Sequence, residues 1–129
     1  MALIKGYIDD AGVDVVLSSP VVFKSHSTTV VDLGPIYTPK IDTMAYLVER
    51  TSAAKKGLFV HSCPIDANYK GSVHAIVYNS SNHKICYDAG SAFCQLVVVP
   101  IETIRDIKCK KIGKRSTSWA GSTDSTKDK

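Results

Sequence analysis

Short runs rich in Val, Ile and Tyr recur along almost the whole chain, separated by clusters of Gly, Pro, Ser, Asn and Asp. They lie at 13–18, 28–34, 44–49, 57–62, 71–79, 83–88, 93–101 and 104–112. Such a pattern is typical of a sandwich or barrel of short antiparallel strands, so we expect an all-β fold. In the run at 71–79 every second residue from Val73 to Val77 is small and apolar, which predicts that one face of this strand lies in the core. We expect another subunit to cover its other, amphipathic face.

The segments between these runs predict turns, one short helix and a tail. Ser and Asn in 80–84 predict a tight hairpin between the strands on either side. The segment 51–57 has Ser and Thr at its start, Ala inside and Gly at its end, and predicts a helical turn or two. The last residues are rich in Ser, Thr, Gly and Lys and cannot bury a core. We therefore expect a single β-barrel domain at 1–113 and a flexible C-terminal tail at 114–129.

Length and charge limit the classes of function. The chain has 129 residues, which suits one domain with its own core. Its formal charge of +4 is too small to indicate a nucleic-acid-binding protein, and its aromatic residues are not interleaved with basic ones as in single-stranded nucleic-acid binders. Residues 105–129 nevertheless hold eight Lys or Arg against three Asp, so we expect an anionic partner there, most simply phosphate.

The sequence predicts no contact with a membrane. No apolar run approaches the roughly twenty residues that cross a bilayer, and the N-terminal residues lack the apolar core of a signal peptide. We expect a cytoplasmic protein, or one of the host cytoplasm or nucleus if the source is viral. The cysteines show neither C-x-x-C pairing nor zinc-finger spacing, so we interpret them as reduced, small apolar side chains. Disulfides are the alternative in an oxidising compartment.

Five polar clusters hold residue types suited to a nucleotide. In the first, Asp10 and Asp14 flank a glycine turn. The alternative to a binding role is that Asp only caps a turn at the entry to a strand. In the second, Arg50, Thr51 and Ser52 combine a guanidinium with two hydroxyls and the N–H groups of a short helix, a set that suits phosphate oxygens. The alternative for this second cluster is a helix N-cap beside an exposed arginine.

The third and fourth clusters depend on single polar residues. Asp66 follows a proline turn and, when ionised, can act as a general base, while Tyr69 offers a ring on which a sugar or base can stack. The alternatives are a turn aspartate and a core tyrosine. Gln95 lies in an otherwise apolar strand, and a buried amide must be hydrogen-bonded, either to the fold or to a ligand.

The fifth cluster lies in the tail and combines an arginine, an aromatic residue and small residues. Its members are Arg115, Trp119, Gly121, Ser122 and Thr123. Backbone N–H groups at the Gly-Ser-Thr turn, together with the arginine, can wrap a polyphosphate while the indole closes over a base. The alternative is a disordered tail with one exposed aromatic residue.

In this order, the five clusters resemble the five motifs of the trimeric dUTP pyrophosphatases, the dUTPase family. The matching stretches are DAGVDV, RTSAAKKG, IDANYKG, AGSAFCQL and RSTSWAGSTD, and they cover nearly the whole chain. The resemblance implies a divergent member of the family with a distorted β-barrel or jelly-roll fold, assembled as a homotrimer with active sites at the subunit interfaces. It implies Mg²⁺-dependent hydrolysis of dUTP to dUMP and pyrophosphate, with the metal held mainly by the triphosphate and not directly by the protein.

The resemblance also implies a role for each cluster. Asp66 would activate a water for attack on the α-phosphorus, residues 63–69 would form the uracil pocket, and the first cluster would support the site. The second and fourth clusters would hold the phosphates, and the fifth would close over them. The substrate-contacting residues implied in this way are Arg50, Thr51, Ser52, Cys63, Ile65, Tyr69, Gln95, Arg115, Trp119, Gly121, Ser122 and Thr123, with Asp10 and Asp14 in support.

Departures from the family pattern leave alternatives open. The glycine usual before the I-D step is Cys63, followed by Pro64, which lacks an N–H group, so a pyrophosphatase of altered pyrimidine specificity is one alternative. Two glycines of the fifth motif are Ser116 and Ser118, and a non-catalytic nucleotide-binding or regulatory protein of the same fold is another. The related dCTP deaminases carry a glutamate where this chain has Ile76, so we do not expect deamination.

Overall fold

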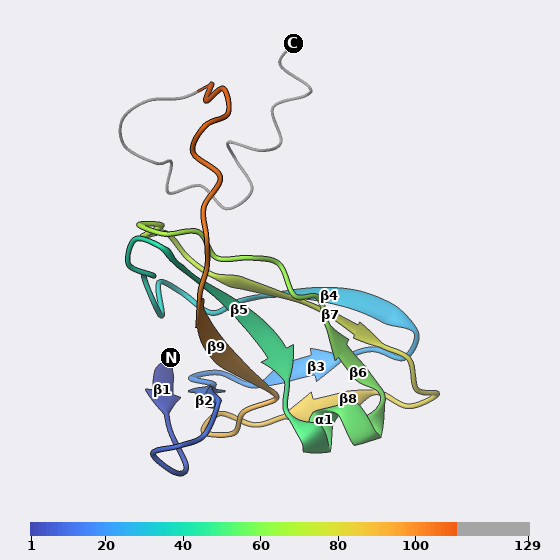
Figure 1. Cartoon of the computed structure of the whole chain (residues 1–129). Helices are drawn as coiled ribbons and strands as arrows, with labels where there is room; N and C mark the ends of the chain where they lie inside the picture. The colour runs from blue at the N-terminus through green and yellow to red at the C-terminus, as the bar shows by residue number, and fades with distance from the viewer. Residues whose placement is uncertain (111–129) are drawn as a thin grey trace.

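The structure is a computed structural model and describes residues 1–110. This part of the chain contains short strands and one helix (Figure 1). In chain order they are β1 (Ala2–Ile4), β2 (Gly12–Val16), β3 (Val21–Phe23), β4 (Ser27–Asp32), β5 (Thr43–Glu49), α1 (Thr51–Lys56), β6 (Leu58–Val60), β7 (His74–Asn79), β8 (Ile85–Tyr87) and β9 (Cys94–Pro100). The prediction of an all-β fold is confirmed.

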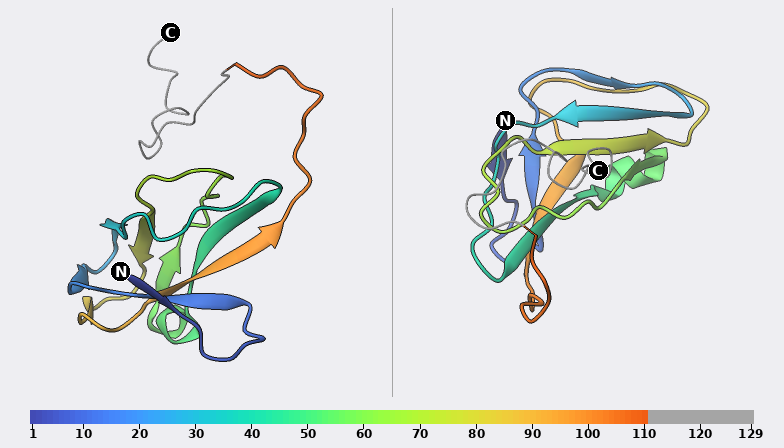
Figure 2. Two further views of the ribbon diagram at one scale, coloured as in Figure 1. Left: turned by 90° about the vertical axis from the view of Figure 1, so that its left-hand side faces the viewer. Right: turned by 90° about the horizontal axis from the view of Figure 1, so that it is seen from above.

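The strands form three antiparallel sheets that share one core. Their orders are β1-β2-β9-β5, β4-β7-β6 and the two-stranded β3-β8. Figure 2 shows the sheets folded around a common interior, in which buried residues from every sheet form one apolar cluster. The short strands and the changes of sheet between sequence neighbours give a distorted barrel.

An aromatic cluster joins the small sheet to the large one. The ring of Phe23 in β3 packs edge-on against Tyr87 of β8, with centroids 6.3 Å apart, and against Phe93, with centroids 5.0 Å apart. Phe93 directly precedes β9 and is fully buried. Since edge-to-face aromatic pairs stabilise a core beyond their buried area, this cluster fixes the start of β9.

Several local predictions are confirmed. In β7 the residues Ala75 and Val77 are buried while their neighbours are half-buried, as the alternation predicts. The helix α1 forms within the segment 51–57 and ends at Gly57, whose φ of 104° lies in the left-handed region that favours glycine.

The predicted hairpin at 80–84 is wrong. Strand β7 pairs with β4 and β6, whereas β8 pairs with β3, so the connection links two sheets instead of two neighbouring strands. It is held by Asn79, which is fully buried. The Asn79 amide donates to the carbonyls of Phe23 and His83, and its oxygen accepts from the N–H and hydroxyl of Ser81.

The predicted strand at 104–112 is also wrong over its described residues, 104–110. The segment after β9 extends away from the sheets as an exposed chain (Figures 1 and 2). Ile104 and Ile107 are 72% and 68% exposed, so their apolar side chains find no partner strand among residues 1–110. Arg105 ties the segment to the rest of the molecule through an ion pair with Asp42 at 2.7 Å.

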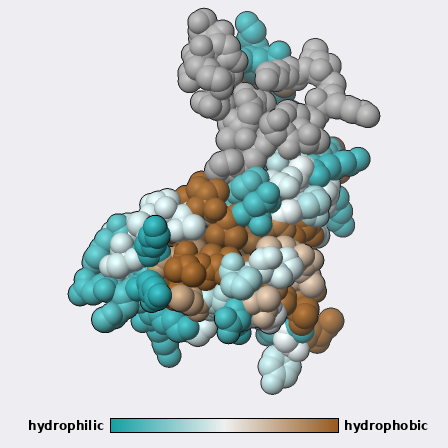
Figure 3. All heavy atoms as spheres, turned by 180° about the vertical axis from the view of Figure 1, so that it is seen from behind, coloured by the Kyte–Doolittle hydropathy of each residue, from teal (hydrophilic) through white to brown (hydrophobic). Residues whose placement is uncertain are grey.

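Two surface features complete the description of residues 1–110. Seen from behind, apolar side chains gather on one face of the molecule (Figure 3). Exposed apolar residues include Val30, Phe59 and Val98, which are 51%, 57% and 39% exposed.

Within residues 1–110 no helix has the length and apolar character needed to cross a membrane.

Candidate nucleotide site

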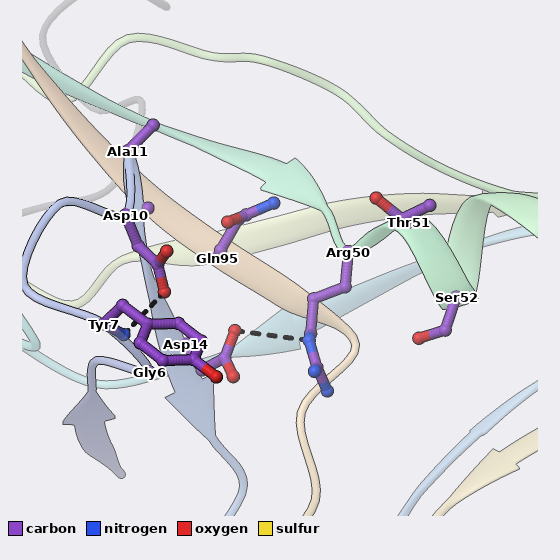
Figure 4. A pocket seen from close by; sticks show the side chains of 10 residues that line it. Gly6, Tyr7, Asp10, Ala11, Asp14, Arg50, Thr51, Ser52 and Gln95 are labelled. Carbon is purple, nitrogen blue, oxygen red and sulfur yellow. Dashed lines mark hydrogen bonds and ion pairs between the residues drawn. The ribbon is translucent and has the colours of Figure 1, made fainter.

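A pocket of about 430 Å³ opens where β2, β9 and the start of α1 meet (Figure 4). Its volume lies within the range of about 300–1,000 Å³ that small-molecule sites occupy. It is lined by Gly6, Tyr7, Asp10, Ala11, Gly12, Asp14, Arg50, Thr51, Ser52 and Gln95. The first, second and fourth clusters, far apart in the sequence, thus line one cavity.

Strand register explains why these side chains meet. Asp14 of β2 and Val48 of β5 both lie opposite Gln95 of β9. Residues directly opposite one another on antiparallel strands point to the same face, so the three share one face of the sheet. Arg50 follows Val48 by two residues, and its N–H donates to the Phe93 carbonyl, which continues the alternation past the end of β5. The face therefore gathers a carboxylate, an amide and a guanidinium.

Arg50 is held in place by two contacts. Its Nε lies 3.2 Å from the Oδ1 of Asp14, and its Nη1 donates to the Ala92 carbonyl at 3.2 Å. The side chains of Arg50 and Asp14 are 42% and 35% exposed, so the pair lies at the pocket surface. Within residues 1–110 the Nη2 group has no hydrogen-bond partner. The guanidinium thus keeps a donor for an incoming anion.

Gln95 extends over Gly12 of β2 and leaves no room there for a Cβ unless the glutamine side chain moves. A Cβ on Gly12 would lie 2.8 Å from the Cδ of Gln95, closer than such atoms approach in proteins. The Gln95 amide donates to the Glu49 carbonyl at 3.4 Å, a long hydrogen bond. The sequence left open whether this amide bonds to the fold or to a ligand. It makes one weak hydrogen bond to the fold, and its side chain also lines the pocket.

The hydroxyls of the second cluster face the pocket from the first turn of α1. Thr51 and Ser52 are exposed, and within the described part of the chain neither hydroxyl makes a hydrogen bond. Arg50 occupies the N-cap position, with extended φ and ψ, but its side chain makes no capping hydrogen bond. The alternative of a simple helix N-cap therefore explains why Arg50 lies at the start of α1. It does not explain the contacts that the Arg50 side chain makes with Asp14 and Ala92.

The turn alternative for the first cluster is confirmed for Asp10. Its Oδ2 accepts the N–H of Tyr7 at 2.8 Å, and its own N–H donates to the Tyr7 carbonyl at 3.1 Å. Asp14 instead lies within β2 and pairs with Arg50. Sequence reasoning missed Tyr7, whose only signal was its place between Gly6 and this turn.

The third cluster lies in the connection between β6 and β7 and does not line the pocket. Ile65 is buried and pairs with Ala45 near the start of β5, through N–H to carbonyl bonds in both directions at 2.7 and 3.2 Å. Arg50 lies just past the other end of this strand. Five residue steps at about 3.3 Å each place Ala45, the partner of Ile65, about 16 Å from Arg50 along the strand. Asp66, next to Ile65, is exposed.

The loop around Asp66 is fixed by backbone contacts. Asn68 adopts a positive φ of 66°, and its N–H donates to the Pro39 carbonyl. Tyr69 is half-buried against the core, and its hydroxyl donates to the Ser72 carbonyl at 2.7 Å. Burial raises the pKa of the Tyr69 hydroxyl above its ordinary value, and the nearby charge of Asp32 raises it further. The core alternative for Tyr69 thus holds in part, with a portion of the side chain left accessible.

The remaining predicted residues divide into two groups. Cys63 is exposed beside the third cluster, and no disulfide forms among the four cysteines. The fifth cluster, from Arg115 to Thr123, and the predicted tail at 114–129 lie outside the described residues. Among residues 1–110 no three His, Cys, Asp or Glu side chains come together to hold a metal ion.

The fold and pocket define a class: an all-β domain whose pocket offers arginine, amide and hydroxyl donors to an anionic ligand. The dUTPase family model matches residues 2–126. The deoxyuridine 5'-triphosphate nucleotidohydrolase of Picosynechococcus sp. is 31% identical over 119 residues, which is 88% of this chain and 84% of that protein. The chain belongs to the dUTPase family.

Other similarities agree with this assignment. The Pol polyprotein of an ovine maedi visna related virus is 29% identical over 93 residues, 72% of this chain, which spans only 9% of that polyprotein. The dUTPase of Staphylococcus bacteriophage 80alpha, solved with dUPNHPP, superposes with a TM-score of 0.72 at 18% identity, covering 90% of this chain and 85% of the phage chain. The shared fold confirms the predicted jelly roll.

Proposed function

We propose that this chain hydrolyses dUTP to dUMP and pyrophosphate. The observation that carries the proposal is the single pocket in which Asp14, Arg50 and Gln95 meet, because these residues belong to three motifs of the dUTPase family. The nucleotidohydrolase of Picosynechococcus and the phage dUTPase bound to dUPNHPP are similar proteins whose substrate class is the same.

In this proposal the pocket binds the phosphates. The guanidinium of Arg50 and the amide of Gln95 donate to phosphate oxygens, and the hydroxyls of Thr51 and Ser52 add neutral donors. Hydrogen bonds from charged or preorganised donors neutralise the charge that spreads over the phosphate oxygens during transfer. The ion pair with Asp14 keeps the guanidinium oriented toward the ligand.

Asp66 is the proposed general base, and a neighbouring subunit supplies it. Asp66 does not line the pocket of its own chain, because its neighbour Ile65 pairs with Ala45, about 16 Å along β5 from Arg50. A homotrimer with each site at a subunit interface removes this difficulty. The apolar face in Figure 3 and the exposed side chains of Phe59 and Val98 support such an assembly, because large exposed apolar patches commonly mark protein interfaces.

The carboxylates at the pocket suit Mg²⁺ bound through the substrate. Asp10 accepts the Tyr7 N–H and Asp14 pairs with Arg50, so each has an oxygen already engaged and neither builds a cage with other acidic residues of 1–110. Mg²⁺ commonly retains waters and binds through one or two carboxylates together with substrate phosphates. Bound with the substrate, Mg²⁺ would supply charge neutralisation for the triphosphate, and the carboxylates of Asp10 and Asp14 would support it from the pocket wall.

The third motif would set the specificity of the site. Tyr69, half-buried and fixed by its bond to Ser72, would pack under the deoxyribose and exclude a 2′-hydroxyl. Ile65 and Cys63 lie on the adjoining segment, where the uracil would be bound. In the tail, Arg115, Trp119, Gly121, Ser122 and Thr123 would close over the nucleotide and exclude water.

Two exposed free cysteines fit a reducing compartment. Cys63 and Cys86 are free and exposed, and exposed thiols persist where glutathione keeps them reduced. The cytoplasm is therefore the proposed location, or the cytoplasm or nucleus of a host for a viral source.

Pyrophosphate release by the purified protein tests the proposal. With Mg²⁺, dUTP should be hydrolysed, whereas dTTP, dCTP and UTP should not. Release from another pyrimidine nucleotide would favour the altered specificity attributed to Cys63 and Pro64. No release from any of the four, by a folded trimer, would favour a non-catalytic nucleotide-binding protein.

The variant Asp66→Asn tests the base. It removes the carboxylate that would accept the proton of the attacking water while keeping the size of the side chain, so turnover should be lost and binding of dUPNHPP retained. Calorimetric titration with dUPNHPP measures the binding. Turnover comparable with the unmodified protein would remove Asp66 from this role.

A further inference from the structure

The first part of the loop between β1 and β2, which lies outside the five motifs, forms a wall of the pocket. Gly6 and Tyr7 lie in this loop and line the pocket beside Asp10 and Asp14. In Figure 4 Tyr7 and Asp10 lie at the opposite end of the pocket from Thr51 and Ser52. A ligand that fills the pocket from the hydroxyls of α1 to this opposite end therefore meets the Tyr7 ring.

The side chain of Tyr7 is largely exposed to solvent. Its side chain is 80% exposed, although it contributes to the lining of a cavity. Within residues 1–110 its hydroxyl makes no hydrogen bond. Tyrosine combines a rigid apolar ring with one polar donor, and it is favoured where one side of a site is wet and the other contacts a ligand.

The backbone of Tyr7 is nevertheless fixed before any ligand binds. Its N–H donates to the Oδ2 of Asp10 at 2.8 Å, and its carbonyl accepts the N–H of Asp10 at 3.1 Å. A Cβ on Gly6 would lie 2.9 Å from the same Oδ2, so glycine at this position leaves space for the carboxylate. The two bonds close a tight turn that presents the ring at the pocket, and preorganisation of this kind lowers the entropic cost of binding.

We propose that Tyr7 is a further substrate-binding residue, whose phenolic O–H donates to an oxygen of the polyphosphate, and that Asp10 is its positioning residue. The inference rests on the proposed function, since it assumes that phosphates occupy this pocket. A hydroxyl donating to an anionic oxygen makes a short, strong hydrogen bond. The phenol adds a donor without adding charge next to Arg50.

The variants Tyr7→Phe and Tyr7→Ala separate the hydroxyl from the ring. Loss of a hydrogen bond to a charged group weakens binding about tenfold or more, so Tyr7→Phe should raise the KM for dUTP and the Kd for dUPNHPP by about tenfold. The kcat should change far less. Tyr78→Phe is the matched control, because Tyr78 lies half-buried on β7, outside the pocket.

The positioning role of Asp10 is tested by two variants. Asp10→Ala removes the acceptor for the Tyr7 N–H and should raise the Kd for dUPNHPP in the same direction as Tyr7→Phe. Asp10→Asn keeps an oxygen acceptor and should recover most of that loss. In the Tyr7→Phe background, Asp10→Ala should weaken binding by less than it does alone, because the two residues act as a unit.

The outcomes distinguish this inference from the proposed function. An unmodified protein that hydrolyses dUTP, with Tyr7→Phe unchanged in Kd, would overturn the inference and leave the function intact. A loss in Tyr7→Ala that is absent in Tyr7→Phe would overturn it too, by assigning the effect to the ring. An inactive protein that binds dUPNHPP through the Tyr7 hydroxyl would support the inference and reject hydrolysis. Absence of any binding would reject both.

Discussion

Replacing Gly12 with Ala is the smallest change that should remove Gln95 from the pocket. The added Cβ would lie 2.8 Å from the Cδ of Gln95, so the two groups cannot both keep their places. Gln95 is the flexible partner and can swing away, whereas the Cβ belongs to the backbone of β2. The φ of Gly12 does not lie in the left-handed region, so alanine fits the strand itself. We therefore expect a folded protein in which one proposed phosphate donor is displaced.

The expected loss follows from the hydrogen bond that Gln95 would make. A bond to a charged oxygen contributes about 1.5–3 kcal/mol, which corresponds to about a 10- to 150-fold fall in kcat/KM for dUTP. Thermal stability should stay equal or rise slightly, because glycine in a strand interior is about 0.5–1 kcal/mol less favourable than alanine. Steady-state kinetics and thermal melting of the purified variant measure the two quantities.

A double-mutant cycle makes this test specific. Gln95→Ala alone should cost as much as Gly12→Ala, and the double variant should be no worse than either, since both remove the same contact. Losses that multiply in the double variant, or a Gly12→Ala protein with the kcat/KM of the unmodified chain, would refute the reasoning. A variant that fails to fold would show that Gln95 cannot move aside.

The remaining predictions concern stability and thiol chemistry. Asn79→Ala should lower the free energy of unfolding by about 3 kcal/mol, because it leaves buried carbonyl and N–H groups without partners; urea denaturation at fixed protein concentration measures it, and a loss no larger than that of the exposed Asn82→Ala would contradict it. Three of the four thiols should react with a disulfide reagent in the native protein, while burial, helped by the charge of Asp14, raises the pKa of the Cys94 thiol to about 12 and keeps it unreactive. In the unfolded chain this thiol ionises near its ordinary value of 9.0, so its contribution to stability should be lost as pH rises from about 9 to about 12. Cys94→Ala should flatten that part of the stability profile, and an unchanged slope would contradict the assignment.

The parts of the fold that the sequence predicted are those with a strong local signal. The alternation in β7 and the closing Gly57 of α1 each follow from side-chain chemistry within a few residues. The three-residue strands β1 and β3 were missed, whereas β6 and β8, equally short, were found only because they lie within longer β-rich runs. Over residues 104–110, the described part of the run at 104–112, the prediction was wrong because β-forming residues make a strand only where a partner strand is present.

The connection after β7 shows a different limit. Ser and Asn at 80–84 gave a correct signal for a turn, but a turn signal does not say which sheet the next strand joins. The fully buried Asn79, through its bonds to Phe23 and His83, directs the chain toward β3. That role depends on a residue 56 positions away in the sequence.

The candidate site divides in the same way. The grouping of Asp14, Arg50 and Gln95 could be predicted, because the order of the motifs resembles that of a family with a known pocket. Tyr7 could not, since its loop shows no periodicity and matches no motif. Nor could the placement of Asp66 at the far end of β5 from Arg50, which depends on the bridge between Ile65 and Ala45.

The central claim is that the pocket of one chain works with Asp66 of another, and subunit complementation tests it most directly. Arg50→Ala and Asp66→Asn should each be inactive as pure proteins. When the two are unfolded together in equal amounts and refolded, about a quarter of the sites in random trimers should combine an intact Arg50 with an intact Asp66, and about a quarter of the dUTP hydrolysis should return. Mixed trimers that remain as inactive as the separate variants would contradict a site shared between chains.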